Sequence, residues 1–416
     1  MRELRALEIA ARSKITFDGE AWSVPSQTTG KKYRVVIGSE PSCQCDDFTL
    51  RQQPCKHIVA ARIVCGRDYG GKAPEISTDA VPKRPTYKQD WPAYNKAQMT
   101  EKRRLQALLH ELCLGVPERS RERKGRMPTP MADVIFSMVF KVYSTLSSRR
   151  FTCDLNDAHE RGYLTKSMHP NKINTRMESA EFTPILKDLI TRSSLPLAAV
   201  ETRFAPDSSG FSTSRFVRWY DEKYGVERSG HDWVKVHLIC GVKTNVVTAV
   251  EIADRNAADC PQFKPLLEAT AKNFNVKEVP ADKAYLSREN LELVESLGAT
   301  AFIPFKANNV PGEAGSLWER MYHYFNFRRD EFLPHYHQRS NVESTFSMIK
   351  AKFGDHVRSR TDDAMVNEVL CKILCHNICC LIQAHCELGI EPVFWQDVKE
   401  ATEAPMILPM VRSFSL

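Results

Sequence analysis

A compact set of cysteines and one histidine near the N-terminus restricts the fold of this chain more than any other feature. A Cys-x-Cys pair at Cys43 and Cys45 is followed, after nine residues, by a Cys-x-His pair at Cys55 and His57. Two close pairs of thiol and imidazole ligands, joined by a short loop, are what a tetrahedral Zn²⁺ ion needs. We therefore expect these four side chains to bind one structural zinc ion in a small N-terminal module. The alternative is that the four side chains are unligated and neighbours by coincidence.

The flanks of this cluster carry a resemblance to a known module. The cluster resembles the SWIM zinc finger, whose pattern is C-x-C, a variable loop and then C-x-H. The similarity extends to Trp22, Val24 and 33–35 upstream and to the PCKHIVA segment downstream. The resemblance implies binding to DNA or protein, often within proteins of mobile elements.

Length and charge set broad limits on the rest of the chain. The chain has 416 residues, of which 42% are apolar, and its formal net charge is +7. That length allows two or three domains with buried cores. A basic balance favours a polyanionic partner, and cations gather at 102–104 and between 119 and 126. The alternative for this stretch is a solvated helix face and loop.

Cysteine usage and hydropathy indicate the compartment. Thirteen cysteines scattered over the chain are more typical of reduced thiols than of a disulfide framework. The best apolar run, residues 131–146, is interrupted by Asp133 and Lys141, and residues 1–13 lack the continuous apolar core of a signal peptide. We therefore expect a cytoplasmic, nucleoid-associated protein without a membrane segment.

Changes in composition and in the spacing of apolar residues along the chain predict its domains. The zinc module occupies 1–70, and a linker containing proline and glycine follows over 71–97. Apolar residues at helical spacing indicate a helical region over 98–194. Residues 195–390 mix strand and helix patterns, and 391–416 form a C-terminal tail.

The mixed region predicts a single α/β sheet domain. The expected order is three strands, a helix, a strand, a helix and a strand. The segments that carry this order are, in turn, 195–204, 233–242, 245–252, 261–274, 277–285, 287–298 and 300–305. The second and third strands are expected to form a hairpin across 243–245.

Three acidic residues of this region are candidates for metal-dependent chemistry. Phosphodiester cleavage is commonly performed by two cations that activate the attacking oxygen and stabilise the leaving oxygen. Carboxylates suit Mg²⁺ because it is a hard ion that prefers oxygen. Asp207 closes the first strand segment, Asp282 ends the fourth, and Glu343 lies in a helical stretch. Other acids compete for the same role: Asp221, Glu222, Asp232, Asp254 and Asp259.

The helical stretch around Glu343 has a distinctive spacing. Tyr336, Arg339, Glu343 and Lys350 are separated by two, three and six residues. At roughly 100° per residue, all four fall on a stripe about 60° wide if the helix begins by Pro334. Such a stripe suits a metal ligand flanked by phosphate contacts. The alternative is a capping box in which Ser340 begins the helix and Glu343 serves its N-terminus.

This spacing resembles the Y-(2)-R-(3)-E-(6)-K signature of DDE transposases from bacterial and archaeal insertion sequences. The similarity covers roughly residues 200–385, including FAPDSSGFSTSRFVRWYDEKYG, PADKAYLSRENL and RSNVESTFSMIKAKFG. The resemblance implies an RNase H-like fold with Asp207 on the first strand, Asp282 after the fourth and Glu343 on a later helix. Together these residues would form a site for two Mg²⁺ ions, with Mn²⁺ as a substitute.

The resemblance also implies partners. Tyr336, Arg339 and Lys350 would contact double-stranded DNA near the scissile bond. The helical region would recognise terminal inverted repeats, and a homodimer would join two DNA ends in a synaptic complex. The activity expected is DNA end cleavage followed by strand transfer into target DNA. The alternatives are a catalytically silent, domesticated DNA-binding protein, a nuclease of the same fold without strand transfer, and an interaction adaptor built on the zinc module.

Other conspicuous residues have simpler interpretations. We expect Asp254 and Asp259 to cap a helix or lie on the surface, and His237 to pack in the core. Trp219 and Trp233 are expected in a sheet layer rather than stacked on bases. Three cysteines of the C-terminal apolar run are expected to pack a buried helix, because residues i and i+8 lie about 12 Å apart along a helix and cannot share one tetrahedral ion. These are Cys371, Cys375 and Cys379.

Overall fold

The computed structural model describes residues 2–27, 31–71, 90–118, 128–213, 233–254 and 256–395. The chain divides into two compact units, Met1–Lys88 and Gln89–Leu416. The basic residues between 119 and 126, and also Trp219, Asp221, Glu222 and Asp232, lie outside the described residues. So do most of the expected linker and of the C-terminal tail.

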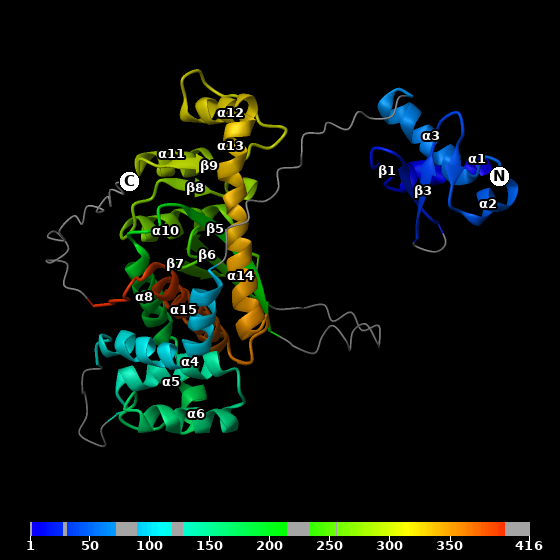
Figure 1. Cartoon of the computed structure of the whole chain (residues 1–416). Coiled ribbons are helices and arrows are strands. Elements are labelled where there is room, and N and C mark those ends of the chain that lie inside the picture. Colours follow the sequence, from blue (N-terminus) through cyan, green and yellow to red (C-terminus); the bar gives the residue numbers. More distant parts are fainter. Residues whose placement is uncertain are drawn as a thin grey trace, which may run out of the picture. The chain divides into compact units, whose positions relative to one another are not determined.

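The N-terminal unit is an antiparallel sheet packed against helices (Figure 1). Its strands follow one another in chain order as β1 (Thr16–Phe17), β2 (Trp22–Pro25), β3 (Lys32–Val36) and β4 (Ser42–Cys43). Its helices are α1 (Arg2–Arg12), α2 (Asp46–Arg51) and α3 (Lys56–Tyr69). Trp22 and Val24 alternate into the core, where Ile58 of α3 is fully buried. The alternating burial of Trp22 and Val24 therefore fixes which face of β2 packs against α3.

Five helices open the C-terminal unit. They are α4 (Trp91–Leu114), α5 (Met131–Ser144), α6 (Ser148–Glu160), α7 (Pro170–Met177) and α8 (Phe182–Ser194). The first of them begins inside the segment expected as linker, because Asp90 accepts a hydrogen bond from the Ala93 amide and Pro92 occupies the first turn. Proline in the first turn is compatible with a helix, since the amide that it lacks has no partner there.

A sheet of three long antiparallel strands forms the centre of this unit. The strands are β5 (Phe204–Ser212), β6 (Trp233–Gly241) and β7 (Val247–Ala253). Two short parallel strands, β8 (Glu278–Pro280) and β9 (Thr300–Phe302), continue the sheet beyond β5 through a parallel bridge between Arg203 and Glu278. The resulting order is β7-β6-β5-β8-β9. This arrangement confirms the mixed α/β fold expected for an RNase H-like domain.

The first predicted strand is wrong in its position. Residues 195–204 were expected to be extended because of their apolar run, but α8 reaches Ser194 and a 3₁₀ turn follows over Leu195–Leu197. The strand begins only at Phe204, so Asp207 lies inside β5 and does not close it. The apolar side chains of the misassigned segment, such as Leu197, are buried beside the helices instead.

Helices cover both faces of the sheet (Figure 1). They include α8, which packs on β7, and α10 (Cys260–Ala271), α11 (Arg288–Ser296), α13 (Arg329–Tyr336), α14 (Ser340–Phe353) and α15 (Asp362–Leu388), whereas α12 (Leu317–Phe327) packs on α11 and α13. Alternation along β5 separates two cores. Phe204 packs with α10 residues such as Phe263, whereas Ala205 and Phe211 pack in the core that includes α14 and α15. Side chains of β5 therefore face α14 at every second position.

The long helix α15 is an internal support of the unit. By length and composition it is the single described helix that could span a membrane, but 78% of its most apolar window is buried inside the protein. Cys371 and Cys375 are fully buried and Cys379 is partly buried. The prediction that these thiols pack a buried helix is confirmed.

Candidate active site and zinc cluster

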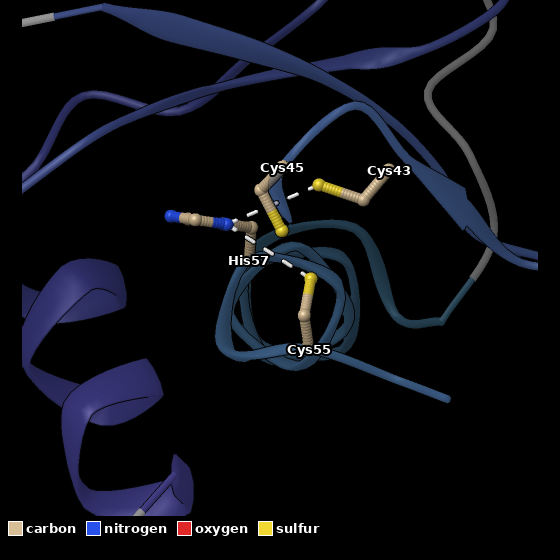
Figure 2. A group of neighbouring side chains, drawn as sticks. All are labelled: Cys43, Cys45, Cys55 and His57. Atoms are coloured by element: carbon tan, nitrogen blue, oxygen red, sulfur yellow. Dashed lines mark hydrogen bonds between the residues drawn. The ribbon is translucent and has the colours of Figure 1, made fainter. Parts of the chain in front are cut away.

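The N-terminal cysteines and histidine meet in one cluster (Figure 2). Cys43 ends β4, whereas Cys45 and Cys55 lie immediately before α2 and α3. Nδ1 of His57 is 3.9 Å from Sγ of Cys43 and 3.9 Å from Sγ of Cys55. One ligand atom from each of the four residues lies within 4.8 Å of all the others. This buried set of three sulfurs and one nitrogen is the donor set of a tetrahedral zinc site.

The electrostatics of the cluster favour one thiolate, at Cys55. The hydrogen bond from Cys43 lowers the pKa of Cys55 to about 3, and the same contact raises the pKa of Cys43. The thiols are therefore close enough to share a proton, which a divalent ion would displace. His57 is 3% exposed and directs Nδ1 into the cluster, where that nitrogen can serve as a ligand.

In the C-terminal unit, strand pairing brings together the segments that carry Asp207 and Asp282. Arg203 and Glu278 form a parallel bridge, and each aspartate lies four residues beyond its member of that pair. This equal offset directs both aspartates toward the same end of the neighbouring strands β5 and β8. Asp282 follows β8, and its carboxylate accepts a hydrogen bond from the Ala284 amide at 3.0 Å.

Glu343 reaches the same region from a helical path that starts well before it. α13 ends at Tyr336, a 3₁₀ turn covers His337–Arg339, and α14 begins at Ser340, so the path hardly breaks (Figure 1). Ser340 has helical backbone angles and no side-chain cap forms at this junction. The capping-box alternative is therefore wrong. The four spaced residues lie on one helical path, as the stripe interpretation requires.

Arg339 connects two of the acids. Its Nη2 donates to Oε1 of Glu343 at 2.6 Å, and its Nη1 lies 3.8 Å from Oδ2 of Asp207. Burial raises the pKa of Asp207, and the charges of Glu343 and Asp282 raise it further, while the Ser208 amide and Arg339 lower it. Asp207 thus experiences the charge of both other acids. The three carboxylates do not all lie within 4.8 Å of one another, because the cysteine cluster is the single group of described residues with three or more ligand atoms that close.

The remaining signature residues flank the acids. Nζ of Lys350 donates to the Ser209 hydroxyl at 2.7 Å and lies 5.3 Å from the Phe211 ring centroid. Tyr336 is partly buried and packs against Phe332. Lys350 therefore binds β5 at Ser209, two residues after Asp207. Tyr336 packs against the core that contains Phe204 and Phe263.

A polar network on the opposite face of β5 was missed by sequence reasoning. Ser208 donates to Asp259 at 2.9 Å, and Lys235 forms an ion pair with the same carboxylate at 3.0 Å. Burial opposes ionisation of Asp259, but these two contacts lower its pKa overall. Asp259 does occupy the cap position of α10, as expected, but its carboxylate caps no amide there and binds Ser208 and Lys235 instead. The network depends on strand register, which pairs Ser208 with His237. No local sequence motif predicts this pairing.

The predictions for two aromatic residues of β6, His237 and Trp233, differ in their outcome. His237 is fully buried 3.6 Å from Asp259, and burial lowers its pKa, so its prediction as a core residue is confirmed. Trp233, expected in a packed sheet layer, is 44% exposed. It lies across Gly210, where an added Cβ would meet the indole ring at 3.1 Å.

Comparison with known families agrees with both parts of this architecture. Residues 199–378 match the transposase DDE domain, and residues 33–66 match the SWIM zinc finger. These two matches confirm both resemblances. It is 27% identical over 175 residues to a "Probable transposase for insertion sequence element ISA1214" of Archaeoglobus fulgidus. The match covers 42% of this chain and 52% of that relative, so the chain spans about half the length of the curated relative that it matches.

Proposed function

We propose that this chain is the DNA transposase of an insertion sequence, which cleaves DNA at the element ends and transfers the cut strands into target DNA. One observation carries the proposal: the charges of Asp282 and Glu343 both act on Asp207 of β5, and Arg339 contacts Glu343 and Asp207. These three carboxylates, from distant parts of the matched segment, are therefore the candidates for one shared metal site.

The carboxylates are the ligands that divalent metal ions require in such an enzyme. Asp207, Asp282 and Glu343 would hold two Mg²⁺ ions, with Mn²⁺ as a substitute, because all three offer hard oxygen donors. Bound ions of this kind activate the attacking oxygen and stabilise the leaving oxygen of a phosphodiester. Glu343 is 54% exposed at its side chain and can adjust toward the two aspartates.

The chain's own residues position the DNA. Arg339 presents a planar guanidinium that can release Glu343 and grip a phosphate, and Lys350 supplies a second charge beside β5. Tyr336 supports the strand near the scissile bond. The helical region over 98–194 recognises the terminal inverted repeats, and the zinc module, holding one structural Zn²⁺, adds DNA or protein contacts. Two ends must be joined, so a homodimer acts in the synaptic complex of a cytoplasmic, nucleoid-associated enzyme.

The decisive experiment uses duplexes from both sides of the reading frame and compares wild type with Asp282→Asn. Wild type should nick an element end in Mg²⁺ and join a pre-cut end to target DNA, whereas Asp282→Asn should bind DNA and do neither. Glu289→Gln, an exposed acid on α11, serves as the matched control and should retain both reactions. Cleavage that persists in Asp282→Asn would refute the site. Nicking without strand transfer would make the chain a nuclease, and binding without nicking would make it a silent DNA-binding protein.

A further inference from the structure

A second cationic feature of the C-terminal unit lies outside the proposed active site. A cavity of about 330 Å³ opens where α5, α6 and α7 meet the loop between α14 and α15. Four cations line this cavity, which we call the basic pocket: Lys141, Arg358, Arg360 and Lys372. Two carboxylates also line it, Glu178 and Glu368. The lining therefore carries an excess of positive charge.

Glu368 is already engaged by the protein. It accepts hydrogen bonds from the amides of Arg358 and Ser359 at 2.9 and 2.8 Å, and from the Ser359 hydroxyl at 2.8 Å. It also lies 3.6 Å from Nζ of Lys372. This carboxylate thus balances the buried Lys372 and fixes the loop, so that Glu178 is the one other acid in the lining to offset Lys141, Arg358 and Arg360.

Those other cations have neutral partners or none. Lys141 donates to the carbonyl of Leu146 at 2.6 Å, and Arg358 donates to that of Thr145 at 2.5 Å. Burial lowers the pKa of Lys141, and the charge of Arg358 lowers it further. Arg360 is exposed, and its side chain forms no hydrogen bond or ion pair within the described ranges. The cations that line the basic pocket therefore repel one another.

The start of α6 adds a second indication of an anionic ligand. Ser147 and Ser148, at the beginning of this helix, line the basic pocket. The first turn has no side-chain cap and no acidic residue, and Arg149 and Arg150 are exposed there. Cations are unfavourable at the positive end of a helix dipole. An anion at this position would accept hydrogen bonds from the free amides and relieve the repulsion.

The basic pocket is connected to the strand that carries Asp207. Lys372 lies 5.4 Å from the ring centroid of Phe211, which Lys350 also approaches. It donates to the carbonyls of Gly354 and His356, in a loop that pairs with Ser212 at the end of β5. Positive charge therefore continues from the end of β5 into the basic pocket.

We propose that the basic pocket binds a phosphate of the DNA backbone and thereby holds the duplex that enters the active site. The inference rests on the proposed function, since it names where that substrate is held. Arg360 provides the free charge, and Arg149 and Arg150 contact adjacent phosphates. Such contacts set the position of the duplex without reading its sequence.

The test measures DNA binding in the Asp282→Asn chain, in which bound DNA is not cut. Arg360→Gln is compared with Lys272→Gln, which removes one charge from an exposed position at the end of α10. Fluorescence anisotropy with a duplex from an element end gives the affinity between about 50 and 200 mM salt. The slope of log affinity against log salt should fall in magnitude by about 1 for Arg360→Gln, the value expected for one lost phosphate contact.

Lys272→Gln should leave that slope unchanged, and adding Arg149→Gln and Arg150→Gln to Arg360→Gln should reduce it further. Equal slopes for Arg360→Gln and Lys272→Gln, with equal unfolding temperatures, would overturn the proposal. Failure of the proposed function would show separately, as an absence of Mg²⁺-dependent cleavage by the wild-type chain whatever the slopes are.

Discussion

Arg339 donates a hydrogen bond to Glu343 at 2.6 Å from one helical turn earlier, and the same guanidinium approaches Asp207 on β5. A cation from the helix is thereby placed between an acid of that helix and an acid of the sheet. Two like charges at one site repel each other, and a planar guanidinium with two separated donors offsets that repulsion. The arrangement makes Arg339 the residue through which helix and sheet carboxylates are coupled.

Replacing Arg339 should impair catalysis more than it impairs DNA binding. We expect Arg339→Ala to slow single-turnover cleavage by about 100-fold at saturating DNA, an effect of the size found when one charge-stabilising group is lost. Arg339→Lys should recover little, because a lysine presents a point charge and cannot reach two acids at once. Rates close to wild type in both variants would show that the guanidinium has no part in the reaction.

Loss of one cysteine should remove the metal from the N-terminal unit. The full-length chain should contain one zinc ion by elemental analysis, and Cys55→Ser should contain none and become protease-sensitive within residues 1–88, because metal binding supplies folding free energy in small zinc modules. Cys65→Ser is the matched control, since Cys65 is buried in the same core but lies outside the cluster. Full zinc content in Cys55→Ser would contradict the ligand set.

His376 should make the C-terminal unit sensitive to acid. Burial lowers its pKa to about 4, and its Nε2 donates to the Asn245 carbonyl at 2.9 Å. The unfolded chain gains a proton near the ordinary pKa of histidine while the folded protein stays neutral. The contribution to stability is therefore complete above about pH 6.5 and is lost as pH falls toward 4, by up to ~3 kcal/mol.

Denaturant unfolding at several pH values measures this effect by comparing wild type with His376→Gln. The variant cannot titrate, so its free energy of unfolding should change less between pH 6.5 and 4 than that of wild type. His169, an exposed histidine at the start of α7, provides the control in His169→Gln. Parallel pH profiles for wild type and His376→Gln would contradict the assignment.

Gly241 should not tolerate a side chain. An added Cβ would collide with the carboxyl group of Glu201, which is 1% exposed. Glu201 cannot move away freely, because it accepts hydrogen bonds from the Thr244 amide and hydroxyl at 2.5 and 2.7 Å. We expect Gly241→Ala to lower the free energy of unfolding by ~1–3 kcal/mol, the usual cost of overpacking. Thermal unfolding checks this, and an unchanged midpoint would show that Glu201 gives way.

Periodicity predicted the central sheet where the pattern is long. The strands at 233–242 and 245–252 and the helix at 261–274 are confirmed as β6, β7 and α10 within a few residues. The first strand was misplaced because the apolar run from Leu195 is compatible with either a strand or a buried turn. Packing against the helices selects the turn. Likewise the spacing of Tyr336 to Lys350 predicted a shared stripe, and the structure keeps that path despite a 3₁₀ turn.

The site itself was only partly readable from the sequence. Asp207, Asp282 and Glu343 could be selected by their neighbours along the chain, but the coupling through Arg339 and the Ser208–Asp259 contact depend on which strands and helices meet. Strand pairing and helix docking bring together residues that are tens to hundreds of positions apart. No local pattern of residue types encodes those contacts.

The bridge between Arg203 and Glu278 has a consequence for how related elements can diverge. Deleting one residue between Arg203 and Asp207 would turn the carboxylate to the α10 face of the sheet, because side chains alternate along a strand. Length changes within residues 306–315, which are mostly exposed between β9 and α12, alter no such parity and should accumulate more freely. Chains related to this one should therefore conserve the first interval to the residue and vary the second.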